Sequence, residues 1–141
     1  MNFEELLKQD KIQKIEKKEF DLALAERDLA ASENNLKAGD YDWALSIAYN
    51  AVLQAGRALM FHFGYRPRGR DQHKTVFEFL EKAKIDDELT NYFNSIRKTR
   101  HIAVYDIAES VSETMAKETV EQANIFVQKI RTFVQKIRTE K

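Results

Sequence analysis

The chain has 141 residues, of which 43% are hydrophobic and 33% are charged, values typical of a soluble globular protein with one core. Lys plus Arg and Asp plus Glu both total 23, so the net charge favours neither nucleic acid nor membrane, and any such preference must come from a local patch. The lack of cysteine excludes disulfides, thiolate metal sites and a cysteine nucleophile, and is typical of a cytoplasmic protein.

Few residues in the chain break helices. Four glycines and one proline indicate long helices with little turn-rich β structure. We therefore predict an all-α fold in a single domain, residues 1–141: a mostly antiparallel bundle of four or five main helices plus short helices. The N-terminal stretch MNFEELLKQDKIQKIEKKEF is charged throughout and lacks the apolar core of a signal peptide. It is expected to form a helix over about 2–17.

The next two helices are bounded by glycines. One is expected at about 19–38 and stops at Gly39, and the other, at about 41–63, begins at the N-cap residue Asp40 and ends at Gly64. Polar residues interrupt the second helix, so it is predicted to be buried rather than to span a membrane; they are Asn50, Gln54, Arg57 and His62. Small residues in the same helix would let another helix approach closely: Ala44, Ala48, Ala51, Ala55, Gly56 and Ala58.

The stretch YRPRGR, residues 65–70, is the one clear loop in the sequence and holds the only proline. Basic residues beside an aromatic ring can grip a nucleic-acid backbone and stack on a base. The alternative is that the loop is merely a solvated connection. The candidate binding residues in and just after it are Tyr65, Arg66, Arg68, Arg70 and His73.

A short helix, QHKTVFEFLEKA at 72–83, is expected after Asp71, which can cap it. Asp86 or Asp87 can cap the fifth helix, which contains the stretch SIRKTRHIAVYD. Apolar residues of this helix form one stripe: Leu89, Phe93, Ile96, Ala103 and Ile107.

Arg100 falls in line with that apolar stripe. A guanidinium among apolar side chains costs several kcal/mol unless it is paired or reaches water. Arg100 could pair with Asp42 or Asp106, or its side chain could extend past the stripe to solvent. A third explanation is that the predicted helix phase is off by one residue.

Arg100 has polar neighbours on the same helix. Arg97, His101 and Tyr105 are spaced by four and lie along an adjacent face, so the four side chains form a compact set within about two turns. Arginine binds phosphate through bidentate hydrogen bonds, and histidine can move protons near neutral pH. Such a set would suit phosphate recognition or RNA cleavage without metal.

The last helix is expected to start at a capping box formed by Ser110 and Glu113. It carries a long apolar stripe: Val120, Ala123, Val127, Ile130, Val134 and Ile137. A tandem repeat, FVQKIRT at 126–132 and again at 133–139, keeps this stripe in phase because seven residues are two helical turns. Repeat slippage that the helix tolerated is one explanation, and a longer contact with another chain is the other.

The sequence contains no pattern typical of a carboxylate–metal site or of a phosphate-binding glycine loop. No Glu is followed three residues later by His, the pairing that carboxylate–metal bundles use. No phosphate-cradling glycine loop is present either. We therefore expect no metal site and no cofactor.

Two segments resemble the HEPN domain family, small helical bundles of prokaryotic toxin–antitoxin systems and RNA-cleaving defence proteins. The first, GDYDWALSIAYNAVLQAGRALMFHFGYRPRGRDQHKTV, is similar to the family's segment of small and aromatic residues followed by a G-Y-rich turn and a histidine. The second, RKTRHIAVYD, stands at the position of the family's R-x4–6-H motif, and the resemblance covers about 21–137. Counted from Arg100, this chain has His101 where the family often has Asn and Tyr105 where it has His; counted from Arg97, His101 follows after three intervening residues.

The resemblance implies a homodimer in which Arg and His of both chains meet, RNA cleavage through the ribose 2′-hydroxyl, and a nucleotidyltransferase partner in a toxin–antitoxin system. Two functions stay open. The displaced histidine favours a binding module that performs no chemistry and holds RNA, a nucleotide or another phosphate ligand, or a partner protein, at the Arg–His–Tyr face in the dimer groove. The alternative is a metal-independent ribonuclease in which Arg100 binds the scissile phosphate, His101 acts as acid or base, and Tyr105 positions the ribose or the histidine.

Overall fold

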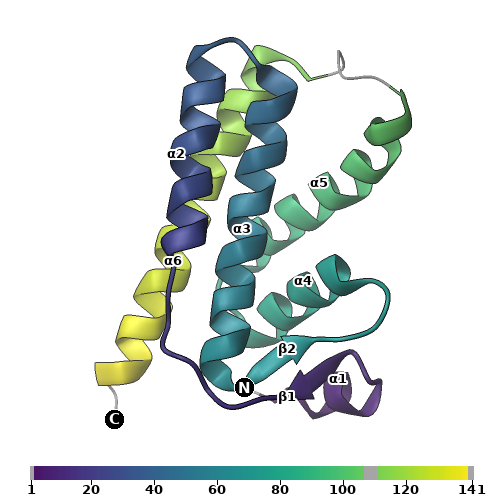
Figure 1. Cartoon of the computed structure of the whole chain (residues 1–141), viewed down its shortest axis with the longest axis vertical. Helices are drawn as coiled ribbons and strands as arrows, with labels where there is room; N and C mark the ends of the chain where they lie inside the picture. Colours follow the sequence, from purple (N-terminus) through teal and green to yellow (C-terminus); the bar gives the residue numbers. More distant parts are fainter. Residues whose placement is uncertain (1, 107–110, 140–141) are drawn as a thin grey trace.

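The computed structural model describes residues 2–106 and 111–139, with side chains throughout except at 99–106 (Figure 1). The described elements, in chain order, are α1 (Glu4–Lys8), β1 (Ile12–Lys14), α2 (Ala23–Lys37), α3 (Tyr41–Phe63), β2 (Tyr65–Pro67), α4 (Gln72–Ala83), α5 (Asp87–Asp106) and α6 (Glu113–Thr139). The predicted all-α bundle is therefore confirmed, with five longer helices, the short α1 and one small sheet.

Helix α3 lies at the centre of the fold and packs against α2 and α6. Helix α2 runs antiparallel to both of them, and α5 diverges from α3 towards its C-terminal end (Figure 1). The small residues of α3 permit this packing, since Ala44, Ala48, Ala51 and Ala55 are all fully buried. A Cβ placed on Gly56 would lie 2.5 Å from Val76 Cγ1, so this glycine lets α4 approach α3 closely.

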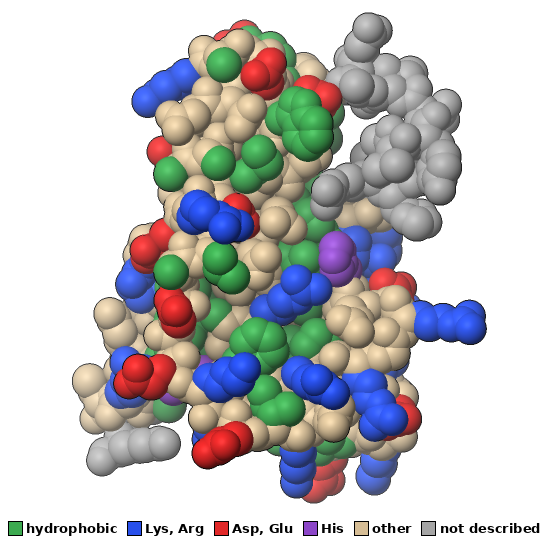
Figure 2. Space-filling view, viewed as in Figure 1, with side chains coloured by type: hydrophobic (Ala, Val, Ile, Leu, Met, Phe, Trp, Pro, Cys, Tyr) green, Lys and Arg blue, Asp and Glu red, His purple; other side chains and the backbone are tan. Residues whose placement is uncertain are grey.

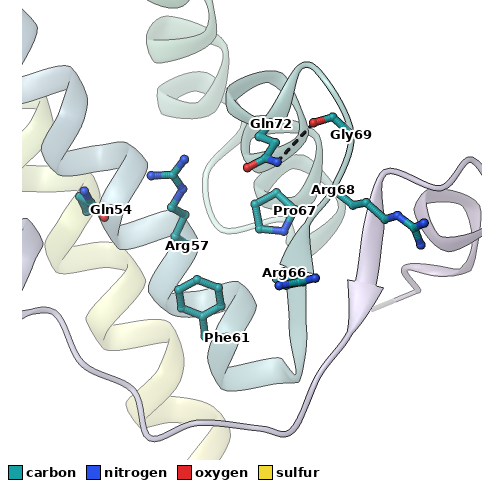
Figure 3. Close-up of a pocket in the computed structure, with 8 residues that line it drawn as sticks. All are labelled: Gln54, Arg57, Phe61, Arg66, Pro67, Arg68, Gly69 and Gln72. Atoms are coloured by element: carbon teal, nitrogen blue, oxygen red, sulfur yellow. Dashed lines mark hydrogen bonds between the residues drawn. The ribbon is translucent and has the colours of Figure 1, made fainter.

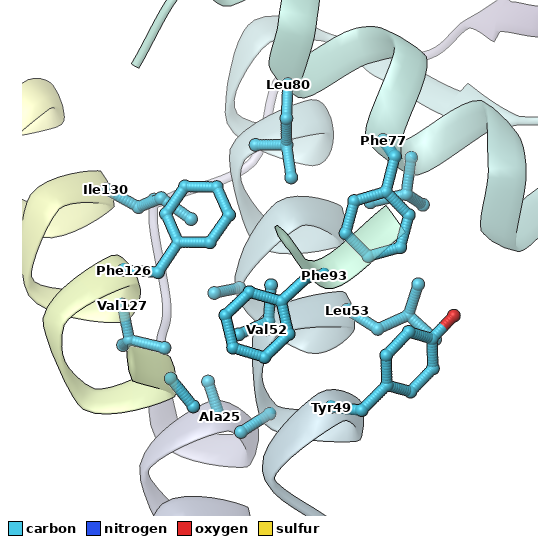
Figure 4. Close-up of a cluster of buried hydrophobic side chains, with 14 of the residues drawn as sticks. Ala25, Tyr49, Val52, Leu53, Phe77, Leu80, Phe93, Phe126, Val127 and Ile130 are labelled. Atoms are coloured by element: carbon cyan, nitrogen blue, oxygen red, sulfur yellow. The ribbon is translucent and has the colours of Figure 1, made fainter. Parts of the chain in front are cut away.

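The core joins apolar side chains of five helices around α3 (Figure 4). Phe93 of α5 and Phe126 of α6 are both fully buried, with ring centroids 6.0 Å apart. Leu89 and Ile96 are buried beside Phe93, which confirms the first half of the predicted apolar stripe. The side chains of Arg100 and Ala103, and Ile107 as a whole, lie outside the described residues.

The prediction of a helix over 2–17 was wrong. Helix α1 ends at Lys8, and Asp10 takes a left-handed backbone conformation with φ of 61° before the chain continues as β1. Strand β1 pairs antiparallel with β2, which replaces the first half of the predicted loop over 65–70. Phe3, Leu6 and Ile12 are all buried in this arrangement, whereas in one continuous helix Ile12 would lie on the face opposite Phe3.

A side-chain hydrogen bond marks the start of α2, but not the starts of α3 and α4. Helix α2 begins at Ala23, because the Asp21 carboxylate accepts a hydrogen bond from the Ala23 N–H at 2.9 Å. Gly64 ends α3 with φ of 86°, as predicted, whereas Asp40 makes no capping hydrogen bond with its side chain. Asp71 likewise makes none at the start of α4.

Helix α6 begins at Glu113, later than the predicted capping box requires. The Ser112 hydroxyl accepts a hydrogen bond from the Met115 N–H at 3.1 Å and thereby caps the first turn. Glu113 is the first helical residue, whereas a capping box would place it third. The predicted cap, Ser110, lies outside the described residues.

Asp86 caps α5, as predicted. Its carboxylate accepts a hydrogen bond from the Leu89 N–H at 2.8 Å and contacts Lys129 Nζ of α6 at 2.5 Å. The backbone hydrogen bond, followed by the Lys129 ammonium, holds the pKa of Asp86 below its usual value. A lowered folded-state pKa stabilises the fold above the unfolded-state pKa, and that stability is lost as the pH falls through the folded-state pKa.

We expect Asp86→Ala to lower the free energy of unfolding by about 0.5–2 kcal/mol at pH 7, the usual cost of a lost N-cap. The difference between wild type and variant should shrink as the pH falls from about 4 towards the lowered folded-state pKa, because Asp86 then binds a proton in the unfolded chain before it does so in the folded protein. Urea unfolding of both proteins at pH 7 and at pH 3 measures this. An equal difference at the two pH values would contradict the assigned role of the Asp86 charge.

In the described part of the chain, every helix is too short or too polar to cross a membrane.

Candidate functional site

A pocket of about 520 Å³ lies between the C-terminal half of α3, strand β2 and the start of α4 (Figure 3). We refer to it as the basic pocket, because three arginines and no carboxylate contribute to its lining. The lining residues are Gln54, Arg57, Phe61, Arg66, Pro67, Arg68, Gly69 and Gln72. A surface of this composition attracts anions and offers them several hydrogen-bond donors.

Helix α3 supplies one wall of the basic pocket. Gln54, Arg57 and Phe61 are three and four residues apart, so they share one face of the helix, while Ala55 and Leu59 are buried on another. Arg57 and Phe61 lie beside α3, on the side nearest Pro67 and Gln72 (Figure 3). Arg57 is half-buried and makes no hydrogen bond or ion pair with any other residue whose side chain is described. Its guanidinium donors are therefore available for a ligand.

Strand β2 supplies the opposite wall, and β1 holds its arginines. Arg66 donates from Nε and Nη2 to Gln13 Oε1, at 3.0 and 2.8 Å, and Gln13 is its register partner in β1. Arg68 Nη1 lies 3.3 Å from Asp10 Oδ1, and the Arg68 side chain points away from α3 (Figure 3). The Arg66 guanidinium is thus fixed at the pocket by a neutral partner, which leaves its positive charge uncompensated.

Lysine and arginine side chains gather on the lower half of the face shown in Figure 2. This is the end of the molecule at which α3 meets β2 and α4 (Figure 1). The chain has equal numbers of acidic and basic residues, so its net charge gives no sign of this basic patch.

His73 lies beside the basic pocket, in the first turn of α4 and next to the lining residue Gln72. The His73 side chain is exposed, and its Nδ1 is 3.4 Å from the hydroxyl of the buried Tyr49. The two ring centroids are 6.2 Å apart, and Tyr49 also packs against Phe77 at 5.9 Å. A buried tyrosine therefore orients the histidine at the surface.

The other predicted binding residues lie outside the lining of the basic pocket. The Tyr65 ring packs against Phe3 and Phe79, at centroid distances of 5.5 and 6.1 Å, so it contributes to the core beneath β2. Arg70 is exposed in the turn before α4. Arg97 is half-buried on α5 and donates from Nε to Asn94 Oδ1 at 2.9 Å. Of the predicted residues whose side chains the structure describes, Arg66 and Arg68 line the basic pocket and the others do not.

Arg100, His101 and Tyr105 belong to α5, which continues to Asp106. Their placement on a helix is therefore confirmed. Their side chains lie outside the described residues, so the predicted Arg–His–Tyr face stays a prediction.

Four residues of the pocket were not among those predicted for a site: Gln54, Arg57, Phe61 and Gln72. A signal for the first three was present, because Gln54 and Arg57 interrupt an apolar helix at a spacing that puts them on one face with Phe61. Gln72 offered no such signal, since it lies on another helix, α4, and only the fold brings it to the same pocket as α3.

Within the ranges the structure describes, no three His, Asp or Glu side chains are close enough together to hold a metal ion.

Comparison with known proteins places most of the chain in one family. The sequence model of the HEPN domain matches residues 19–137, from the segment before α2 to the last turns of α6. A protein of Methanocaldococcus jannaschii, named "Putative toxin MJ0142", is 28% identical over 109 residues, which cover 76% of this chain and 74% of that protein. The family match begins after β1, so Gln13 and Asp10, which contact the pocket arginines, precede it.

Proposed function

The chain belongs to the HEPN domain family, and on that premise we propose that it binds single-stranded RNA, with the basic pocket holding phosphates of the RNA backbone. The observation that carries the proposal is the composition of this pocket: arginines from α3 and β2, two glutamine amides and no carboxylate. A phosphodiester carries one negative charge and accepts several hydrogen bonds, which matches that set of donors.

Arg57 and Arg66 are the two guanidiniums best suited to phosphate. Arg57 has no partner among the residues whose side chains are described, and Arg66 is oriented by a neutral amide. Phe61 adds an aromatic surface to the same pocket. Cationic grooves with aromatic side chains are typical of proteins that bind single strands with little dependence on sequence.

In this proposal the Arg–His–Tyr face of α5 is a second contact for RNA. Arg97, Arg100, His101 and Tyr105 would line the groove of a homodimer, as the family resemblance implies. The name of the Methanocaldococcus jannaschii relative supports a role as a toxin, and a nucleotidyltransferase would then be the partner protein. No cofactor is needed for the proposed binding of RNA.

A metal-independent ribonuclease is the second candidate, and the toxin name of the relative is the observation that favours it. Arg100 would bind the scissile phosphate, His101 would act as general acid or base, and Tyr105 would position the ribose or the histidine. The same pocket would hold the RNA in either case.

Titration of a labelled single-stranded RNA in EDTA tests both candidates, with binding followed by anisotropy and cleavage by gel. We expect saturable binding that weakens steeply with salt, because each phosphate contact releases a counterion. Binding without cleavage supports the binding module. Cleavage that falls about 10²–10⁴-fold in His101→Ala supports the ribonuclease, since this is the usual contribution of general acid–base catalysis. The absence of binding would contradict the proposed function.

Gln13→Ala should weaken RNA binding about two- to tenfold, because Arg66 loses the acceptor that fixes its guanidinium at the pocket. Gln128→Ala is the matched control, since Gln128 is exposed on α6 and does not line the basic pocket. Equal RNA affinities for Gln13→Ala and wild type would show that Arg66 needs no support from β1.

A further inference from the structure

A second pocket, of about 250 Å³, adjoins the basic pocket, and we refer to it as the side pocket. The two share a wall formed by Gln54, Arg57 and Phe61 of α3. The rest of the side pocket comes from the segment before α2 and from the facing turns of α2 and α3: Lys18, Glu19, Asp21, Leu24 and Ala58. A ligand group held by Arg57 in one pocket is therefore next to the other.

The two pockets on either side of Arg57 differ in the side chains that line them. The basic pocket has three arginines and no carboxylate, whereas the side pocket has two carboxylates and an apolar surface. Leu24, Ala58 and Phe61 form that surface, and Leu24 is 52% exposed although it is a large hydrophobic residue. An apolar surface with a few polar groups at its edge is typical of a site for a flat organic ring.

Besides Gln54 and Arg57 of the shared wall, the polar groups of the side pocket are two carboxylates and one ammonium. Asp21 accepts a hydrogen bond from the Ala23 N–H through Oδ1, which orients the carboxylate and leaves Oδ2 without a partner among the described residues. The exposed Glu19 side chain makes no hydrogen bond or ion pair to another described residue. Lys18 Nζ lies 5.0 Å from the centre of the Phe61 ring. The site thus offers acceptors and a donor around an apolar floor.

We propose that the side pocket receives the nucleobase adjacent to the phosphate bound at Arg57, and that it prefers bases carrying both an amino group and a carbonyl, cytosine and guanine, over uracil. The inference rests on the proposed binding of RNA at the basic pocket. An exocyclic amine donates to the Asp21 or Glu19 carboxylate, and a base carbonyl accepts from the Lys18 ammonium. Uracil has no amine, and its ring N–H is flanked by two carbonyl oxygens that a carboxylate repels.

Cytosine and uracil provide a matched pair of ligands, because they share size and backbone charge but differ in the amine. We expect wild-type protein to bind a short oligocytidylate about five- to tenfold more tightly than an oligouridylate of equal length at pH 7.5. This is the low end of the usual discrimination by hydrogen bonds to bases, because both carboxylates are exposed.

The double variant Glu19→Gln, Asp21→Asn should reduce this preference to less than about twofold, because an amide can donate as well as accept. Asn at position 21 keeps the oxygen that caps Ala23, and equal thermal melts of variant and wild type would verify the fold. A wild-type protein that binds both oligonucleotides equally, with affinity lost in Arg57→Ala, would overturn the side-pocket inference alone. Binding of neither oligonucleotide, or binding that Arg57→Ala does not weaken, would overturn the proposed function and the inference with it.

Discussion

Arg57→Ala should weaken binding of single-stranded RNA about ten- to hundredfold and leave the free energy of unfolding nearly unchanged. The affinity loss follows from removing hydrogen bonds to a charged group, which contribute about 1.5–3 kcal/mol. Arg57 pairs with no carboxylate among the residues whose side chains are described, so its removal strands no buried charge there. Anisotropy titrations and urea unfolding of wild type and variant measure the two quantities.

Arg138→Ala is the matched control for this variant. Arg138 is exposed in the last turn of α6 and lines neither the basic pocket nor the side pocket, yet its loss changes the net charge equally. If the two variants weaken RNA binding to the same small extent, the effect is one of overall charge and the basic pocket is not the RNA site. A large loss of stability in Arg57→Ala would instead give the guanidinium a structural role.

Phe126→Ala should lower the free energy of unfolding by about 3–5 kcal/mol, the usual cost of deleting a buried phenylalanine side chain. Phe126 is 0% exposed and packs against Phe93, which anchors α5 to the core. Loss of this ring leaves a cavity where α3, α5 and α6 meet (Figure 4). Urea unfolding at pH 7 measures the change.

The tandem repeat supplies the control, because Phe133 occupies in the second copy of FVQKIRT the position that Phe126 has in the first. Phe133 is only half-buried and touches Phe63 edge-on, at a centroid distance of 6.3 Å. Phe133→Ala should therefore cost about 1–2 kcal/mol, in proportion to the smaller area removed from water. Equal losses for the two variants would show that the second copy is as much a part of the core as the first.

The repeat also illustrates what helical periodicity can predict. The apolar stripe of α6 is buried from Val120 to Val134, as its spacing requires, and only Ile137 is half-buried near the helix end. Boundaries marked by a single strong residue, such as Gly64 and Asp86, were predicted for the same reason: the signal is local. Helical periodicity and capping residues were therefore enough to predict the long helices.

The small sheet could not be predicted in this way. Each strand has three residues, too few for an alternating pattern, and β1 pairs with a strand about fifty residues away in sequence. The basic pocket depends on this pairing, because Gln13 of β1 holds Arg66. The basic composition of residues 65–70 was enough to predict Arg66 and Arg68 as candidates. Arg57 could be assigned to the pocket only once the fold was known, because α3 must lie opposite β2.

Arginine footprinting of the RNA-bound protein shows whether RNA occupies the basic pocket. Phenylglyoxal modifies exposed guanidiniums, and mass spectrometry reports the extent at each arginine, with and without a saturating 2′-O-methyl RNA that cannot be cleaved through its ribose hydroxyl. We predict that RNA slows modification of Arg57 and Arg66 several-fold and leaves Arg138 unchanged. Modification of Arg57 and Arg66 at the free-protein rate, with the RNA bound and other arginines protected, would place the RNA elsewhere and rule out the basic pocket as its binding site.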